Sequence, residues 1–382
     1  MPPIESQSDV TDSLAAVLML PPAGHTEAER WVALGRVAAA EDLVRRLLAT
    51  GAFQPVLVLA AEQSDAARLA AAGAQPLEQR PDGFHFGEAL AQVIRGHGLA
   101  QLAYFGGGSA PLASEQVLRG ALDLMRSAAA GTTVVNNLHS TDWALLGAAQ
   151  AVTDRPQRFP NDNALGWVLS QEAGVPVLDL PAAAATRLDI DTPTDLVAAA
   201  DHPDLGHALA AFLGQAPPNL LKALHQVRQV LRTPASQLTL IGRTSSHAWA
   251  QLERRTQIWV RVFAEERGML ASGRMERGEV RSLLYGLTGD SSPERLVQIL
   301  STISQAVLWD TRVWMAAAGG WPSAADRYAA DLGWVEQIKD PNLLRLSRAI
   351  QESTIPILAG GHGVVAGGIY ALLETMEAAN CA

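Results

Sequence analysis

Short apolar runs alternate with amphipathic stretches along roughly the first half of the chain. We predict buried strands for the apolar runs, and helices where apolar residues recur with helical spacing. The predicted strands cover residues 14–20, 55–60, 99–105, 132–136 and 175–180. Strands alternating with helices in this way predict an α/β fold, with a mostly parallel, doubly wound sheet and helices on both of its faces.

Helical spacing dominates the second half. The predicted helices cover residues 219–231, 247–267, 274–287, 293–317, 324–332, 341–352 and 364–379. A stretch rich in proline and glycine, 205–218, precedes them and is typical of a linker. The pattern therefore predicts an α/β domain over 1–204, a linker over 205–218 and an all-α domain over 219–382.

Charge and composition narrow the function classes. Residues 1–204 hold 12 Arg, no Lys and 24 Asp plus Glu, within a chain whose net charge is −10. An acidic half without lysine argues against nucleic-acid binding, which needs a basic surface. The sequence has no run of 18 uncharged apolar residues, so we predict no membrane span. The first residues lack the basic stretch of a secretory signal. With Cys381 as the single cysteine, we expect a reducing, cytoplasmic setting.

A glycine corner follows the predicted strand 99–105. The strand ends on Gly106, Gly107 and Gly108, and Ser109 leads from them toward a helical pattern that starts at Ser114. Glycines allow backbone to approach a ligand closely and to adopt positive φ. Because open α/β sheets bind ligands at the carboxyl ends of their strands, we predict a ligand site at this corner.

A second motif carries a resemblance to a known family. The stretch Arg187-Leu-Asp-Ile-Asp-Thr-Pro-Thr-Asp-Leu196 resembles a segment of nucleotidyltransferases with the GT-A-like fold, in particular the molybdenum-cofactor and phospholactate guanylyltransferases. The glycine corner and the helical stretch 35–48 resemble further segments of that family in order and spacing. The resemblance covers roughly residues 14–200 and implies a GT-A-like or Rossmann-like sheet, a nucleotide substrate and Mg²⁺.

The chain departs from that family at two positions. The loop after the first strand holds a single glycine and no lysine, so Arg30 or Arg36 would have to steady the phosphates. Ser109 stands where the family has its metal-binding aspartate, and a hydroxyl is a poor ligand for Mg²⁺. The resemblance therefore moves the expected metal role to Asp189 and Asp191, which point the same way if this segment is extended.

Other polar stretches are candidates for binding the substrate or its acceptor. They contain Asn136, Asn137, His139 and Asp142 in one segment, and Asn161 and Asn163 in another. Ordinary polar loops and helix caps are the alternative interpretation of both segments. A glycine-rich run, 359–368, could cradle a phosphate or let two helices pack closely, and opposite charges at Asp310 and Arg312 indicate a buried ion pair.

Two functions from different classes remain open at this point. The first is a nucleotidyltransferase that passes a nucleotidyl group from an NTP to a small phosphate- or hydroxyl-bearing acceptor. The second is a catalytically degenerate scaffold that binds a nucleotide or sugar nucleotide, and a glycosyltransferase is a weaker alternative. We expect no nucleic-acid or membrane partner, and a homodimer through the helical domain.

Overall fold

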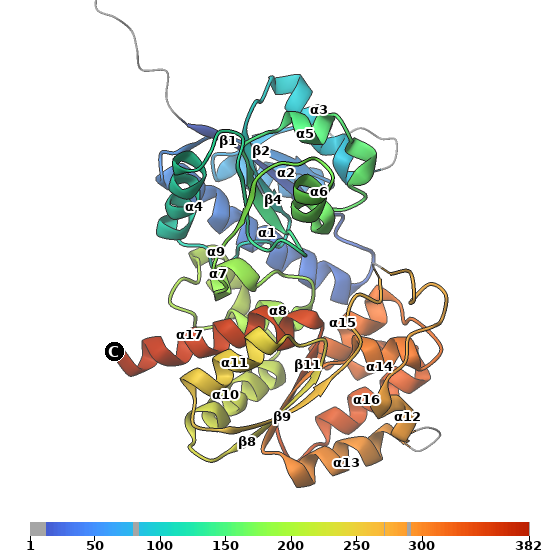
Figure 1. Cartoon of the computed structure of the whole chain (residues 1–382). Coiled ribbons are helices and arrows are strands. Elements are labelled where there is room, and N and C mark those ends of the chain that lie inside the picture. The colour runs from blue at the N-terminus through green and yellow to red at the C-terminus, as the bar shows by residue number, and fades with distance from the viewer. Residues whose placement is uncertain (1–12, 79–83, 271, 289–291, 382) are drawn as a thin grey trace, which may run out of the picture. The chain divides into compact units, whose positions relative to one another are not determined.

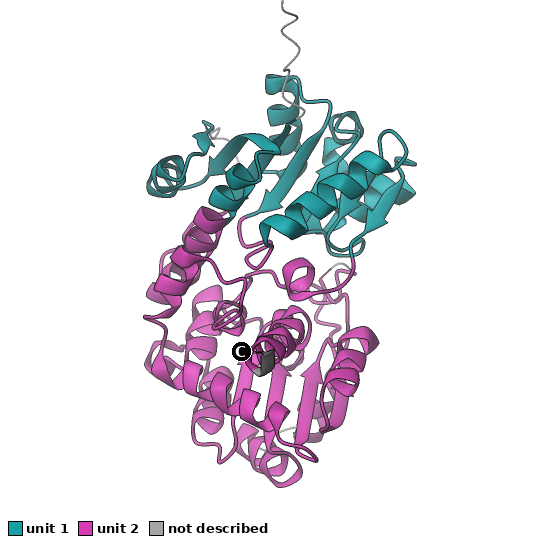
Figure 2. Cartoon of the chain, turned by 90° about the vertical axis from the view of Figure 1, so that its left-hand side faces the viewer, with its two compact units in different colours: residues 1–19, 43–106, 114–180 teal, residues 20–42, 107–113, 181–382 magenta. Residues whose placement is uncertain are grey.

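The computed structural model describes residues 13–78, 84–270, 272–288 and 292–381. The residues on which the expectation about a secretory signal rests lie outside them. Contacts divide the chain into two compact units (Figure 2). The first unit takes in described residues of 13–19, 43–106 and 114–180, and the second takes in those of 20–42, 107–113 and 181–381. This division interleaves along the sequence and differs from the domains that composition suggests.

The first unit is built on a seven-stranded sheet in the order β3-β2-β1-β4-β6-β5-β7 (Figure 1). Its strands are β1 (Leu14–Leu20), β2 (Phe53–Ala60), β3 (Gln75–Pro76), β4 (Leu102–Gly106), β5 (Thr133–Val135), β6 (Trp143–Leu146) and β7 (Val177–Asp179). Strand β6 runs antiparallel to both neighbours, whereas β1 with β4, β2 with β3 and β5 with β7 are parallel. The predicted α/β class with a mostly parallel sheet is confirmed.

Helices cover this sheet. They are α2 (Gln63–Ala71), α3 (Phe86–His97), α4 (Glu115–Ser127), α5 (Gln150–Thr153) and α6 (Leu165–Gln171). Helices α3, α5 and α6 bury apolar side chains in one core cluster with alternate residues of β1, β2 and β4, among them Val17, Leu57 and Tyr104. Helix α4 begins at Ser114, whose hydroxyl caps the amide of Val117 at 3.4 Å. Helix α1 (Glu27–Ala49) belongs to both units, with the change after Asp42.

The second unit contains a sheet that the sequence pattern missed. Its four strands lie in the order β11-β10-β8-β9, and every pair is parallel. They are β8 (Gln237–Gly242), β9 (Trp259–Ala264), β10 (Ala306–Asp310) and β11 (Ile357–Gly360). The prediction of an all-α second half is therefore wrong, although this half is rich in helices. Strand β10 was predicted as part of a helix, because a short apolar run between two helices cannot be distinguished from a helix by periodicity alone.

The helices of the second unit agree with the sequence pattern in part. They are α7 (Ala184–Arg187), α8 (Pro193–Ala198), α9 (His207–Leu213), α10 (Pro218–Arg232), α11 (Ser246–Arg255), α12 (Leu283–Thr288), α13 (Pro293–Ile303), α14 (Arg312–Ala317), α15 (Ala324–Leu332), α16 (Pro341–Gln351) and α17 (Gly367–Cys381). Helix α17 packs against α7 and α11 (Figure 1). None of the helices in the described ranges combines the length and the apolar character needed to cross a bilayer.

Helix α9 lies inside the predicted linker and is held there by a buried carboxylate. Asp42 of α1 accepts hydrogen bonds from the amides of Ala208 and Leu209 at 2.9 and 2.8 Å. A carboxylate at a helix N-terminus satisfies amides that have no partner within the helix. Residues 205–218 are thus part of a packed element within the second unit.

Candidate functional site

The predicted site residues fall in both units. The first unit holds Gly106, Asn136, Asn137, His139, Asp142, Asn161 and Asn163. The second holds Arg30, Arg36, Gly107, Gly108, Ser109, Asp189 and Asp191. Each group is described by itself.

In the first unit, polar side chains meet where β4 and β5 end. The amide of Gly106 donates to the carbonyl oxygen of Asp142 at 2.9 Å. The Asn136 side chain is 2% exposed, donates to Asp142 Oδ2 at 3.0 Å and accepts from the amides of Asp142 and Trp143. Asn136 therefore shapes the loop and fixes Asp142, and it has little surface left with which to meet a substrate.

A second carboxylate, that of Asp162, also lies beside Gly106. The Tyr104 hydroxyl donates to Asp162 Oδ2 at 2.8 Å. A Cβ atom on Gly106 would stand 2.9 Å from the same oxygen, so glycine at this position makes room for the carboxylate. We call Gly106, Asn136, Asp142 and Asp162 the polar edge. Asp162 and Tyr104 are not among the residues that the sequence predicts for the site, although a buried tyrosine hydroxyl indicates a nearby polar partner.

The remaining candidates of this unit belong to two loops that are tied together. Asn137 Oδ1 accepts from the amide of His139 at 3.2 Å, which is an ordinary turn. Ser140 Oγ donates to Asn163 Oδ1 at 2.8 Å and connects the loop to the segment before α6. The side chains of His139, Asn161 and Asn163 are exposed. These three can meet a ligand from solution.

In the second unit, the glycine corner serves packing. The amide of Ile190 donates to the carbonyl oxygen of Gly108 at 3.0 Å, and a Cβ atom on Gly108 would stand 2.7 Å from the Ile190 oxygen. Ser109 is buried, with 3% exposed. Gly108 is therefore needed so that two backbone segments of the protein can approach each other.

Arg36 holds the segment that carries Asp189 and Asp191. Its Nε donates to the Ile190 oxygen at 2.7 Å, its Nη2 donates to the Asp191 oxygen at 3.3 Å, and Nη2 lies 3.9 Å from Asp191 Oδ1. Asp189 is half-buried, and the Asp191 side chain is 73% exposed. The guanidinium of Arg36 therefore binds backbone oxygens of the protein itself. The side chain of Arg30, in contrast, is exposed to solvent.

The carboxylates bear on the expected Mg²⁺. No group of three or more His, Cys, Asp or Glu side chains within the described residues is arranged to hold a metal ion. Mg²⁺ is usually bound through one or two protein carboxylates together with phosphate oxygens, so a pair is sufficient. At Asp191 the guanidinium of Arg36 competes with a cation, and the carboxylates of Asp142 and Asp162 accept from Asn136 and Tyr104.

The loop after β1 has its anion-binding groups occupied by the protein itself. Glu29 accepts from the amides of His25 and Thr26 at 3.1 and 3.0 Å and from the Thr26 hydroxyl at 2.8 Å. Although burial opposes ionisation, these bonds, led by the Thr26 amide, lower the pKa of Glu29. These amides belong to the two residues before α1, so Glu29 and Thr26 close a capping box at the start of this helix.

The glycine-rich run 359–368 packs against the motif that carries the family resemblance. Cβ atoms on Gly360, Gly361, Gly363 and Gly367 would stand 2.7, 2.6, 2.0 and 2.1 Å from atoms of Thr194, Thr192, Asp195 and Arg187. These contacts favour the close-packing interpretation of the run over the phosphate cradle. The glycines let η4 (His362–Val365) and the start of α17 lie directly on the 187–198 segment.

Gly367→Ala is expected to lower the free energy of unfolding by about 2–3 kcal/mol, because the added methyl group would meet the backbone oxygen of Arg187. Urea unfolding followed by circular dichroism measures the change. Gly286→Ala in α12 is the matched control, since a Cβ atom there meets nothing within 4 Å and should stabilise by up to about 1 kcal/mol. Equal stability of both variants would contradict the packing role.

The motif also buries a carboxylic acid. Asp195 is 0% exposed, and its Oδ2 accepts from the amide and the hydroxyl of Thr192 at 2.8 and 2.9 Å. Oδ1 has no hydrogen-bond partner in the described structure. Burial, with a smaller contribution from the Asp191 charge, raises the pKa of Asp195 to about 7.

A buried charge network lies at the carboxyl end of the second sheet. Asp310, the last residue of β10, accepts from Arg243 Nε and Nη2 at 2.6 and 3.1 Å, while Arg312 binds Asp331 at 3.0 and 2.5 Å. Burial opposes the charge of Asp310, but the Arg243 guanidinium holds its pKa below the ordinary value. The sequence predicted a buried ion pair between Asp310 and Arg312. Each of them is in a buried ion pair, but Asp310 pairs with Arg243 and Arg312 pairs with Asp331.

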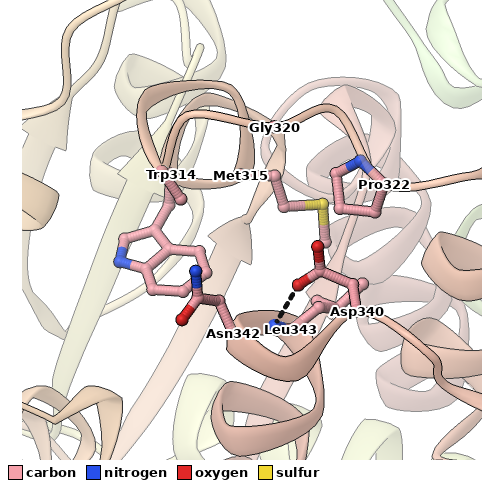
Figure 3. Close-up of a pocket in the computed structure, with 8 residues that line it drawn as sticks. Trp314, Met315, Gly320, Pro322, Asp340, Asn342 and Leu343 are labelled. Atoms are coloured by element: carbon pink, nitrogen blue, oxygen red, sulfur yellow. Dashed lines mark hydrogen bonds between the residues drawn. The ribbon is translucent and has the colours of Figure 1, made fainter.

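A small cavity lies between α14 and α16 (Figure 3). Its lining includes Trp314, Met315, Asp340 and Asn342, and its volume is about 20 Å³. In Figure 3 the Asp340 carboxylate accepts from the Leu343 amide at 2.8 Å. A cavity of this size accommodates one water molecule, so it is too small for a nucleotide.

Comparison with known proteins adds little to this geometry. No protein-family model and no curated protein matches the chain. Among solved structures, the chain is similar to a cytidylyltransferase from Leptospira borgpetersenii serovar Hardjo-bovis (strain JB197). The identity is 12%, the TM-score is 0.36, and the match covers 52% of this chain and 89% of that one.

Proposed function

We propose that this chain is a nucleotidyltransferase-like protein that binds an NTP at the polar edge and passes its nucleotidyl group to a small phosphate- or hydroxyl-bearing acceptor. The observation that carries the proposal is that Asp142 and Asp162 both meet Gly106, the first with its backbone oxygen and the second with its carboxylate. They lie at the carboxyl end of β4, where an open α/β sheet binds its ligand. The resemblance of the 187–196 motif to nucleotidyltransferases is in accord with it.

The chemistry would be an in-line attack of the acceptor oxygen on the α-phosphorus, with pyrophosphate leaving. Asp142 and Asp162 would hold Mg²⁺, and Asp189 and Asp191 are the alternative pair. When bound, Mg²⁺ neutralises charge on the phosphate oxygens and orients the reacting groups. Asn136 positions Asp142, Tyr104 positions Asp162, and exposed His139, Asn161 and Asn163 would contact the acceptor. If the alternative pair holds the metal, exposed Arg30 of the same unit would steady the phosphates.

Asp142→Asn and Asp162→Asn are each expected to lower the rate of pyrophosphate release by at least about 100-fold, because the amide cannot replace a carboxylate toward Mg²⁺. The measurement is a coupled pyrophosphate assay with a panel of NTPs and acceptors. Asp154→Asn is the control, since this carboxylate of the same unit is exposed and, within the described residues, bonds only the nearby Gln150 side chain at 2.6 Å.

Variants of Asp189 and Asp191 show which pair of carboxylates holds the metal. If Asp189→Ala and Asp191→Ala abolish turnover while the polar-edge variants retain it, the metal role belongs to the second unit. If all four variants and the wild type release pyrophosphate at one rate, the proposed site is wrong.

A second candidate, a nucleotide-binding scaffold without transferase activity, is favoured by the contacts of Glu29 and Ser109. The Glu29 carboxylate already occupies the amides of the two residues before α1, and Ser109 is buried where the family that the chain resembles has a metal ligand. Saturable nucleotide binding without pyrophosphate release from any acceptor would identify the scaffold. Pyrophosphate release that depends on the acceptor would exclude it.

A further inference from the structure

Strand β9 is an edge strand, and no hydrogen bond within the described part of the chain engages the backbone on its outer side. The amides of Trp259 and Glu265 donate toward β8, to the oxygens of Ser236 and Gly242 at 2.7 and 2.8 Å. Alternation along a strand therefore turns the amides and carbonyls of Val260, Val262 and Ala264 away from β8. No residue of β9 is fully buried, whereas five of the six residues of β8 are.

Other edge strands in the described part of the chain are short or blocked. Strand β3 has two residues and includes Pro76, β7 has three, and β11 has four, most of them buried. Strand β9 has six residues in continuous register with β8, and none is proline or lysine. Natural edges are usually protected by such residues, by bulges or by being short. An unprotected edge of this length indicates a strand-pairing surface.

The sequence of β9 is self-complementary in one antiparallel register. When two copies cross at Phe263, each Arg261 lies opposite Glu265 of the other copy, and the two residues share one face of the sheet. Crossing at Arg261 would place two guanidinium groups opposite each other, and crossing at Val262 would place each arginine opposite a phenylalanine. Opposite charges directly across a strand pair are stabilising, and like charges are destabilising.

The Arg261 guanidinium and the Glu265 carboxylate can each form a further hydrogen bond to a second copy. Arg261 is exposed, and only its Nη1 makes hydrogen bonds in the described structure, to Gln237 Oε1 at 2.6 Å and to the Ile303 oxygen. Glu265 is half-buried, and its Oε1 accepts from Ser282 Oγ at 2.9 Å. Burial, with smaller contributions from the nearby charges of Asp310 and Glu266, raises the pKa of Glu265. A guanidinium from a second copy would offset that penalty.

We propose that a second copy of this chain pairs with β9 in antiparallel orientation about Phe263, so that two four-stranded sheets join into one. The arrangement is isologous, so each copy gives and receives the same Arg261–Glu265 contact. It uses main-chain hydrogen bonds for affinity and the charge pair for register. The surface is independent of the polar edge, so the proposal does not rest on the proposed function.

Disulfide trapping tests the register. Residues opposite each other at a pair without mutual hydrogen bonds have Cα atoms about 4.5 Å apart, within disulfide range. In a Cys381→Ala background, Phe263→Cys is therefore expected to give a covalent dimer on mild oxidation. Trp259→Cys is the matched control, because this 70% exposed residue would lie about 26 Å from its copy at 3.3 Å per residue. Equal cross-linking of the two variants would overturn the register.

Sedimentation of the intact chain tests the dimer itself. Val262→Pro removes an outward amide and leaves the bonds to β8 in place, so we expect a monomer with an unchanged circular dichroism spectrum. Arg261→Glu and Glu265→Arg should each lose the dimer, and the double variant should recover it. A wild type that stays monomeric at the highest soluble concentration, or a dimer that survives Val262→Pro, would overturn the proposal.

Discussion

Replacing Asp331 by asparagine is expected to lower the free energy of unfolding by about 3–5 kcal/mol, because it leaves the Arg312 guanidinium buried without its carboxylate. The two side chains are 2% and 5% exposed and are joined by a pair of hydrogen bonds. Burial raises the pKa of Asp331, although the Arg312 guanidinium opposes this, and Asp331 in turn raises the pKa of Arg312. Arginine keeps its charge in proteins, so removing the carboxylate leaves a buried guanidinium that water cannot reach.

Urea unfolding of matched variants measures this effect. Glu294→Gln breaks the exposed pair with Arg345, whose side chains are 40% and 47% exposed, and should cost at most about 1 kcal/mol. Replacing both members of the buried pair, Arg312→Met with Asp331→Leu, should recover much of the loss. If Asp331→Asn loses no more than about 1 kcal/mol of unfolding free energy, as the surface control does, the proposed role of the buried pair is contradicted.

The second large effect is a pH dependence that originates at Asp195. Its pKa is about 7 in the folded chain, against an ordinary value of 3.8. The folded state therefore holds the proton more tightly than the unfolded state between these two values. The stability that this proton contributes is complete below the lower value and is lost as the pH rises through the upper one. At 1.36 kcal/mol per pKa unit, the loss amounts to roughly 4 kcal/mol.

Asp195→Asn removes this dependence, because the amide is neutral at every pH and still accepts from Thr192. The difference in unfolding free energy between wild type and variant is expected to change by roughly 4 kcal/mol between about pH 4 and pH 8, in favour of the variant at high pH. Subtracting the two proteins cancels the other titrating groups. A difference that stays constant across this range would show that Asp195 is ionised throughout.

The bounds of several helices and strands can be predicted from the sequence, because residues at their own ends determine where they start and stop. The seven apolar residues of β1 end at Pro21, and both bounds of the strand are predicted. Helix α15 starts after Ser323, whose hydroxyl caps the amide of Asp326, and ends at Gly333 with φ 74°. Each of these elements carries its own start and stop signals.

Other features depend on partners far away in the chain. Strands β9 and β10 are short and adjoin helices, and only their pairing with β8 defines them. Asp162 joins the polar edge through Tyr104, which is 58 residues away in sequence. The glycines of 359–368 are explained only by the segment on which they pack, more than 160 residues earlier. Such tertiary contacts leave no local periodicity to read.

Nucleotide binding itself is the most direct test of the proposed function. Isothermal titration of the four NTPs, with and without Mg²⁺, should show one that binds with Mg²⁺ dependence in the wild type. That binding should weaken at least about tenfold in Asp162→Asn and stay unchanged in Asp154→Asn. At a hundredfold excess over Kd, the same nucleotide should add about 2.7 kcal/mol to the unfolding free energy. If no NTP or sugar nucleotide binds with or without Mg²⁺, the chain is neither a nucleotidyltransferase nor a nucleotide-binding scaffold.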